Sequence, residues 1–187
     1  MNLQNYVLDA IRTESRIDSV NVNIENLVAI LNIFIASGNL LDDIKKNVFY
    51  NKPIQTEKWD YNNQELKKNI SNISSGYELN DLNKTELSLD PRLFHALIGI
   101  ATESTELMEA IVKTVQTGAL IDHVNIREEI GDIGWYTAIA MDTTNSNWEQ
   151  ILKTNIEKLR KRYPEKFTSS HAIHRDLDAE REILEQK

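Results

Sequence analysis

The sequence predicts an all-α fold, and three observations support that prediction. Only three prolines and six glycines occur among the 187 residues, so helix-breaking positions are few. Apolar residues recur at helical spacing along almost the whole chain. No segment shows the sustained alternation of apolar and polar residues that marks a half-buried strand. The length allows one domain, or two small ones, with a substantial hydrophobic core.

The first part of the chain is predicted to be helical and then to give way to a connection. Residues 1–60 form an N-terminal helical region, in which Pro53 marks the end of the first helical stretch. Residues 61–90 are rich in Asn and Ser and poor in long apolar runs. This composition is typical of a loop, so we interpret residues 61–90 as a linker.

The second part, residues 91–187, is predicted to hold the main helical region. Asp90 followed by Pro91 is a favourable helix start, because an N-cap acceptor precedes a proline in the first helical position. Pro164 closes the region. The charged tail, residues 171–187, is expected to form a solvated helix.

The two parts also show signs of an internal duplication. Glu103 and Glu106, whose role is discussed below, fall on Ala36 and Asn39 when the chain is shifted by 67 residues. A first half related to the second would therefore have lost these acids. The alternative is that any two amphipathic helices can be matched in this way. The same shift superposes the apolar pairs Ala29 and Ala96, Ile33 and Ile100, Leu40 and Leu107, Ile44 and Ile111, and Val48 and Val115.

Composition excludes several classes of partner. The chain has 21 Lys+Arg against 29 Asp+Glu, a formal net charge of -8, so it has no general attraction for nucleic acids or anionic membranes. The absence of cysteine excludes disulfides and thiolate metal sites, and is compatible with a reducing cytoplasm. The longest uncharged stretch, residues 26–41, is shorter than the roughly 18 apolar residues of a spanning helix. Residues 1–10 lack the basic start of a signal peptide. We expect a cytoplasmic protein without membrane or nucleic-acid partners.

Two pairs of acids carry the candidate chemistry. Glu103 and Glu106 are three residues apart, as are Glu129 and Asp132, so in helices the members of each pair are surface neighbours. If the two helices pack together, the four carboxylates form an all-oxygen site of the kind that suits Mg²⁺ or Mn²⁺. We interpret all four as metal ligands. For either pair alone, an ordinary solvated helix face is the alternative.

The surroundings of the acids favour the metal-site interpretation. Residues 133–141 contain no charge, so the helix that begins at the second pair is expected to be buried on every face. Asp132 would then lie at the mouth of a buried helix, where a carboxylate needs a cation partner or a shifted pKa. Small residues that leave room for close approach share the side of the first pair, namely Ala96, Gly99 and Ala110.

These segments resemble the MazG-like superfamily of all-α NTP pyrophosphohydrolases. The two acid pairs, separated by 22 residues, match its acid signature, and residues 155–164, Asn-Ile-Glu-Lys-Leu-Arg-Lys-Arg-Tyr-Pro, match its Asn-x-x-Lys segment. The resemblance covers about residues 92–182 and is greatest for MazG-like proteins common in phages and bacteria. Ser104 and Thr105 differ from the Ala-Gly or Val-Gly that is more usual there, but neither position is a ligand.

The resemblance implies a four-helix-bundle core that depends on Mg²⁺, with Mn²⁺ as a substitute, and usually assembles as a homodimer. It also implies cleavage of an NTP or dNTP to the monophosphate and pyrophosphate. Glu106 is the favoured general base. Asn155, Lys158 and Arg162 share one helix face and are expected to contact phosphates, although basic residues also suit a helix C-terminus. Tyr163 is expected to stack on the base or to complete the packing.

Two other classes of function compete with this interpretation. The first is a catalytically inactive helical bundle that senses nucleotides or binds a protein partner. The second is a ferritin-like di-iron protein, which would need Glu-x-x-His pairs, and no His lies three residues after any of the four acids. No signature of a Ser, Cys or Lys nucleophile is present, so direct attack by water is preferred over a covalent intermediate.

Overall fold

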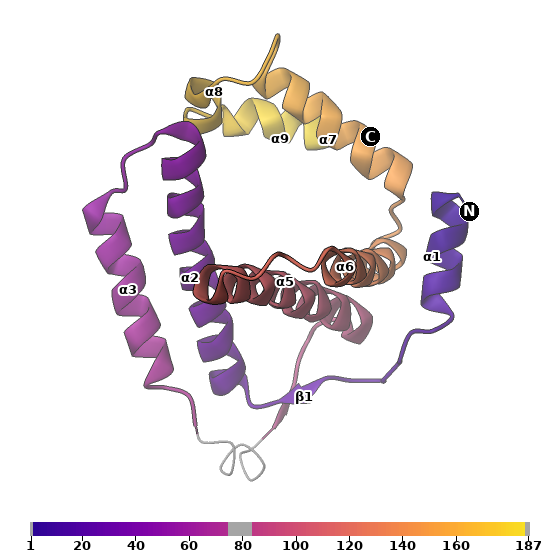
Figure 1. The fold of residues 1–187 in the computed structure, drawn as a ribbon. Coiled ribbons are helices and arrows are strands. Elements are labelled where there is room, and N and C mark those ends of the chain that lie inside the picture. Colours follow the sequence, from indigo (N-terminus) through magenta and orange to yellow (C-terminus); the bar gives the residue numbers. More distant parts are fainter. Residues whose placement is uncertain (1, 75–83, 186–187) are drawn as a thin grey trace. The chain divides into compact units, whose positions relative to one another are not determined.

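The computed structural model describes residues 2–74 and 84–185, and confirms the all-α prediction (Figure 1). Two short strands, β1 and β2, pair antiparallel, with Asn21 opposite Glu86 and Val22 opposite Thr85. The helices and strands are α1 (Leu3–Ile11), β1 (Asn21–Val22), α2 (Ile24–Tyr50), α3 (Thr56–Ile70), β2 (Thr85–Glu86), α5 (Pro91–Thr117), α6 (His123–Thr143), α7 (Trp148–Arg162), α8 (Ser169–Ile173) and α9 (Leu177–Glu185).

The chain divides into two compact units, which differ from the predicted domains. The first unit comprises Met1–Val20 and Ser88–Lys153, and the second comprises Asn21–Leu87 and Thr154–Lys187. Each unit therefore combines segments that are far apart in the sequence. The boundaries predicted at residues 60 and 90 are wrong for this reason: they follow local composition, whereas the units follow long-range contacts between helices.

The predicted linker over residues 61–90 is also wrong in its first part, because α3 continues to Ile70. Two of the asparagines that suggested a loop, Asn62 and Asn69, are only 3% and 4% exposed. Their side chains donate to the helix carbonyls of Lys58 and Glu65, at 3.0 and 2.7 Å. Buried Asn satisfied in this way is compatible with a helix. Residues 75–83 of the predicted linker lie outside the described residues.

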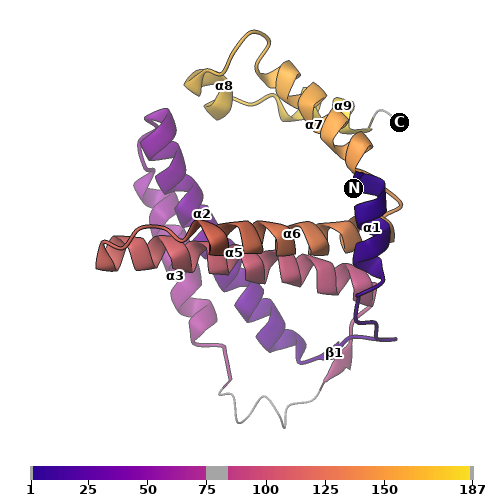
Figure 2. The ribbon, with the colours of Figure 1, turned by 45° about the vertical axis from the view of Figure 1, so that its right-hand side comes forward.

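In the first unit, α5 and α6 form an antiparallel pair of helices (Figures 1 and 2). Asp90 caps α5 by accepting from the Leu93 amide at 2.9 Å, which confirms the predicted helix start. Gly118 ends α5 with a φ of 71°, a left-handed conformation that glycine adopts without strain. The connection of only five residues, 118–122, then returns the chain alongside α5.

Small residues set how closely α5 and α6 approach. Ala96 is fully buried, and a Cβ atom placed on Gly99 would lie 2.2 Å from the ring of Tyr136. The aromatic ring of α6 therefore occupies the space that the missing side chain leaves on α5. This agrees with the prediction that small residues near the first acid pair permit close approach.

Helix α1 closes one end of this pair by packing on α6. Its residues Val7 and Ala10 form a buried cluster with Ala138, against which larger side chains pack, namely Tyr6, Ile11, Trp135 and Trp148. Arg92 at the start of α5 donates to Glu14 at 2.8 Å and to Asp142 at 2.7 Å. The segment after α1 and the ends of α5 and α6 are thus joined by one ionic network.

In the second unit, α2 and α3 form another pair of neighbouring helices, and their contact is polar. The Asn32 side-chain amide donates to Asn69 at 3.4 Å, and that of Asn39 donates to Asn62 at 3.3 Å. An ion pair between Lys58 and Asp43, with a distance of 2.8 Å, continues the same row of contacts (Asp43 is largely buried).

By length and composition alone, α2 is long and apolar enough to cross a membrane. The helix nevertheless carries Asn26, Asn32 and Asn39, whose amides contact Ser74 and α3. In the structure, α2 packs along α3 as one half of a helical hairpin.

The chain ends in two short helices, α8 and α9, instead of the single solvated helix that was predicted. Glu180 is 3% exposed and binds two guanidinium groups. Arg162 contacts it at 2.8 and 2.6 Å, and Arg175 contacts it at 3.2 and 2.6 Å. These bonds lower the pKa of Glu180 to about 2. The tail is thus fixed to the end of α7 by a buried ionic cluster.

The helical pairs α2–α3 and α5–α6 share three of their four helix ends under the 67-residue shift found in the sequence, and α6 continues six residues beyond the position that corresponds to the end of α3. Helices α2 and α5 both have 27 residues and start and end at corresponding positions. Each follows an Asn or Asp N-cap, and each ends in a left-handed residue, Asn51 or Gly118. Helices α3 and α6 also begin at corresponding positions, Thr56 and His123. The correspondence supports the predicted duplication and extends it from apolar positions to helix ends.

Candidate metal centre

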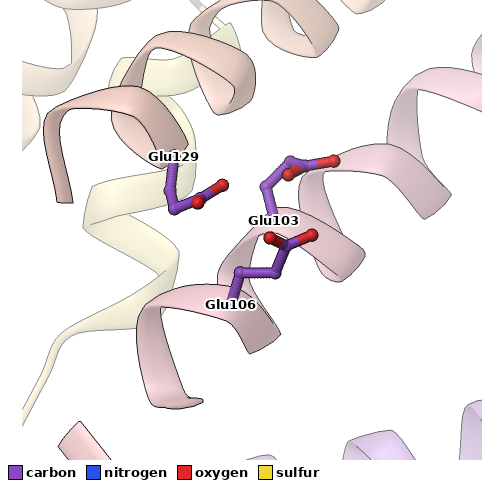
Figure 3. A group of neighbouring side chains, drawn as sticks. All are labelled: Glu103, Glu106 and Glu129. Carbon is purple, nitrogen blue, oxygen red and sulfur yellow. The ribbon is translucent and has the colours of Figure 1, made fainter. Parts of the chain in front are cut away.

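Three glutamates converge where α5 faces α6 (Figure 3). Glu103 and Glu106 project from neighbouring positions on α5, and Glu129 extends toward them from α6. Each offers a carboxylate oxygen, and these oxygens all lie within 4.8 Å of one another. Glu129 is only 3% exposed, Glu103 is half-buried and Glu106 is exposed. The cluster is thus open to solvent on one side and anchored in the packing of α6 on the other.

Asp132, the fourth predicted ligand, does not belong to this group of three. It is exposed, whereas the sequence predicted it at a buried position. The buried acid of the second pair is Glu129, which lies almost one turn earlier on α6. Asp132 still acts on the same region, because its charge helps to raise the pKa of Glu106 and of Tyr136. Residues 133–141, which were predicted to be buried on every face, are only partly so: Ala138, Ile139 and Met141 are buried and the other six are half-buried.

The electrostatics of the cluster favour a bound cation. The charge of Glu129 is the main reason that the pKa of Glu106 is raised. The pKa of Glu129 is raised first by burial and then by the charge of Glu103. A hydrogen bond of 2.6 Å from the Asn125 side-chain amide to Glu129 offsets only part of the repulsion between the carboxylates. Three carboxylates held together with no basic partner among the described residues repel one another, and a divalent cation would remove that repulsion.

The donor set therefore fits a hard divalent cation. All the converging atoms are carboxylate oxygens, the donors that Mg²⁺, Ca²⁺ and Mn²⁺ prefer over softer metals. Glu103, Glu106 and Glu129 are the residues that would hold such an ion. The exposed side of the cluster leaves room for further oxygen ligands, which Mg²⁺ commonly takes from water and from substrate phosphates.

Beside the cluster, a pocket of about 450 Å³ is lined by a basic residue, Lys113, that the sequence analysis did not single out as a site residue. Lys113 lies on α5 seven residues after Glu106, and both line this pocket. The available signal was this spacing, because residues seven apart share a helix face. Lys113 and Arg92 are also the only Lys or Arg residues in α5. The remaining lining residues are Glu109, Ala110, Thr114, Leu120, Ile121, Asp122 and Asn125.

The predicted substrate-binding residues run from the middle of α7 to the residue just after its end, in the second unit. Asn155 and Lys158 are half-buried on one side of α7. Arg162 is held by Glu180, so its guanidinium already has a carboxylate partner. The Tyr163 ring packs against Phe167, with ring centroids 5.4 Å apart. This contact supports the alternative that Tyr163 completes the packing. Of the two basic residues in this set, Lys158 is the one that forms no ion pair among the described residues.

Comparison with known families identifies the segment that carries these acids. Residues 95–167 match the family model described as the MazG nucleotide pyrophosphohydrolase domain. The matched segment is about two fifths of the chain and contains both acid pairs and most of α5, all of α6 and all of α7. No curated protein and no solved structure matched the chain.

Proposed function

We propose that this chain, whose residues 95–167 form a domain of the MazG-like superfamily, hydrolyses a nucleoside triphosphate to the monophosphate and pyrophosphate. The observation that carries the proposal lies inside the matched segment: carboxylate oxygens of Glu103, Glu106 and Glu129 lie within 4.8 Å of one another. The family match indicates the reaction class, and the acid cluster supplies a site at which that class of reaction can occur.

We propose Mg²⁺ as the metal, with Mn²⁺ as a substitute and Asp132 as a fourth ligand or a partner of metal-bound water. Such an ion, when bound, neutralises phosphate charge and activates water. Glu103 and Glu129 hold the site from opposite helices. Glu106 is the most exposed of the three clustered acids, so it is the best placed to meet substrate and water.

In the proposed reaction, Glu106 accepts a proton from the attacking water. The water oxygen forms the new bond to phosphorus, and the P–O bond between the α- and β-phosphates breaks. Pyrophosphate leaves from one side and the nucleoside monophosphate from the other. Direct attack by water needs no side-chain nucleophile, in agreement with the absence of a Ser, Cys or Lys signature in the sequence.

The chain needs cations for a polyanionic substrate, because its net charge is -8 and a metal held by carboxylates is largely neutralised by them. We propose that Lys158, together with Asn155, contacts the phosphates. A charge-assisted hydrogen bond of this kind contributes on the order of 2 kcal/mol, or about thirtyfold in a rate or equilibrium constant.

Lys158→Ala is therefore expected to lower kcat/KM at least tenfold in a steady-state assay. Thermal stability should change little, because Lys158 forms no ion pair in the described part of the chain. Lys161→Ala is the matched control, since Lys161 is a neighbouring exposed lysine on another side of α7. Equal losses in the two variants would show only a diffuse effect of basic charge, and the contact assigned to Lys158 would be wrong.

The direct test of the proposed function is a panel of NTPs and dNTPs incubated with the protein and Mg²⁺. We expect release of pyrophosphate and the matching monophosphate, and loss of both after chelation of the metal. Release of orthophosphate alone would contradict the proposal. Binding of nucleotides without any hydrolysis would favour the alternative drawn from the sequence, an inactive nucleotide-sensing bundle. The predicted homodimer stays a prediction, to be checked by light scattering.

A further inference from the structure

The pocket beside Glu106 is lined by three acidic residues and by one basic residue, Lys113. It lies between the last turns of α5 and the first turn of α6 and has a volume of about 450 Å³. One wall carries Glu106, Glu109 and Lys113, and the other carries Ile121, Asp122 and Asn125. Asn125 also donates to Glu129 at 2.6 Å, so the pocket is continuous with the acid cluster through two of its residues.

Lys113 is near the carboxylate of Asp122 in this pocket but is not ion-paired with it in the described structure. It forms no ion pair within the part of the chain that the structure describes. The acid opposite it, Asp122, is the N-cap of α6 and accepts from the amides of Val124 and Asn125, at 2.9 and 3.4 Å. These hydrogen bonds are the main reason that the pKa of Asp122 is lowered, and the charge of Lys113 adds to the shift. The ammonium group is therefore near Asp122 but remains available to a ligand.

The spacing along α5 suits a ligand that reaches beyond the acid cluster. Seven residues correspond to about 10 Å along a helix, which separates the Glu106 and Lys113 backbones. A flexible lysine side chain covers part of this distance. A chain of phosphates that starts at the acid cluster and extends along α5 would therefore meet the ammonium group. Without that contact its outer phosphates would face only the carboxylates of Glu109 and Asp122, which would repel them.

We propose that this pocket receives the β- and γ-phosphates of the substrate and that Lys113 binds them. The inference rests on the proposed function and adds a direction to it: the phosphate tail lies along α5 toward Gly118. When the P–O bond between the α- and β-phosphates breaks, negative charge remains on the departing pyrophosphate. The ammonium group of Lys113 then pairs with that charge, and charge-assisted hydrogen bonds are stronger than neutral ones.

Product inhibition by inorganic pyrophosphate and by the nucleoside monophosphate tests this assignment. Lys113→Ala should raise the inhibition constant for pyrophosphate at least tenfold and change that for the monophosphate less than twofold. Lys113→Arg should keep most of the affinity for pyrophosphate. The control Lys161→Ala should leave both constants unchanged, because Lys161 lies outside the pocket. Circular dichroism would verify that each variant keeps its helices.

The outcomes separate this inference from the proposed function. If the wild-type protein released no pyrophosphate from any nucleotide, the proposed function would fail and this inference with it. If the wild-type protein is active and Lys113→Ala keeps normal inhibition by pyrophosphate, only the assignment of Lys113 is overturned. A change confined to the monophosphate would also overturn it, because the pocket would then hold the nucleoside.

Discussion

The α2–α3 and α5–α6 hairpins correspond at three of their four helix ends but have opposite chemistry at their contact. In α5–α6, Glu106 and Glu129 meet as carboxylates. The positions 67 residues earlier are Asn39 and Asn62, and they meet as amides at 3.3 Å. In both hairpins the residue from the first helix is exposed and its partner from the second is 3% exposed. The difference is thus one of charge at positions whose burial is alike.

The amide pair and the acid pair place different demands on the surroundings. An Asn side chain both donates and accepts hydrogen bonds. Asn39 donates to Asn62, and Asn62 donates in turn to the Lys58 carbonyl, so this contact forms without a ligand. Ionised Glu only accepts, so the acid pair needs an external cation to relieve its repulsion. One helical scaffold can thus be either self-sufficient or dependent on a ligand, according to a few side chains at its centre.

A second difference lies about two turns away from these pairs in each hairpin. Gly99 of α5 packs beneath the ring of Tyr136, whereas the corresponding Asn32 and Asn69 hydrogen-bond at 3.4 Å. An aromatic ring over a glycine gives an apolar contact that fixes the distance between α5 and α6. An amide pair gives a directional polar contact instead. The hairpin that carries the acids is therefore also the one with close apolar packing next to them.

The largest expected effect comes from making the acid hairpin resemble the amide hairpin. Glu106→Asn should lower kcat/KM by at least about 100-fold, since loss of a metal ligand should cost no less than loss of a group that merely supports one. Asn39→Ala is the matched control at the corresponding exposed position and should stay within about twofold of the wild type. Steady-state kinetics with the preferred nucleotide measure both.

The other predicted ligands extend this test. Glu103→Gln, Glu129→Gln and Asp132→Asn should each nearly abolish turnover while circular dichroism shows unchanged helical content. Near-normal kinetics in all these variants and in Glu106→Asn would show that the acids do not form a metal site. Asp132→Asn is the most informative single variant, because Asp132 lies outside the group of three converging acids.

The reverse experiment gives acids to the amide hairpin. The substitutions Ala36→Glu, Asn39→Glu and Asn62→Glu reproduce the acid pattern there, since Glu65 already stands at the position that corresponds to Asp132. In a background with Glu129→Gln, where the original site is weakened, we expect the variant to bind one Mn²⁺ that the background protein does not bind tightly. Calorimetry gives the stoichiometry.

The substitution Ala36→Glu is not essential to this experiment. Ala36 is 3% exposed, so a version that keeps it and changes only Asn39 and Asn62 guards against unfolding. Failure of both helical, folded variants to bind Mn²⁺ would show that the two hairpins differ in more than their acids, and the idea of a degenerate copy would lose its chemical basis.

The smallest expected effect concerns one glycine in each hairpin. Gly99→Ala forces a methyl group against the Tyr136 ring and should lower the free energy of unfolding by about 1–3 kcal/mol. Gly38 lies within α2 and has open space at its Cβ position, so Gly38→Ala should raise that free energy by about 0.5–1 kcal/mol. Urea denaturation measures both values. Changes of the same sign would contradict the close packing inferred for α5 and α6.

Local sequence patterns were enough to predict the helical class, the start of α5 and the two acid pairs. These features depend on neighbours within about one helical turn: Asp90 caps the helix beside Pro91, and each acid pair follows helical spacing. The family resemblance drew on the same local patterns, and the match over residues 95–167 confirms it.

Which of these side chains meet depends on how the helices pack. The Tyr136 ring occupies the space beside Gly99, and in this packing Glu129 is buried while Asp132 stays exposed. The same packing also brings Asp122 close to Lys113, so that a lysine with no distinctive local pattern becomes part of a pocket. The sequence could not show these contacts. Helical spacing tells which residues share a face of one helix, but not how two helices are turned and shifted along their axes against each other.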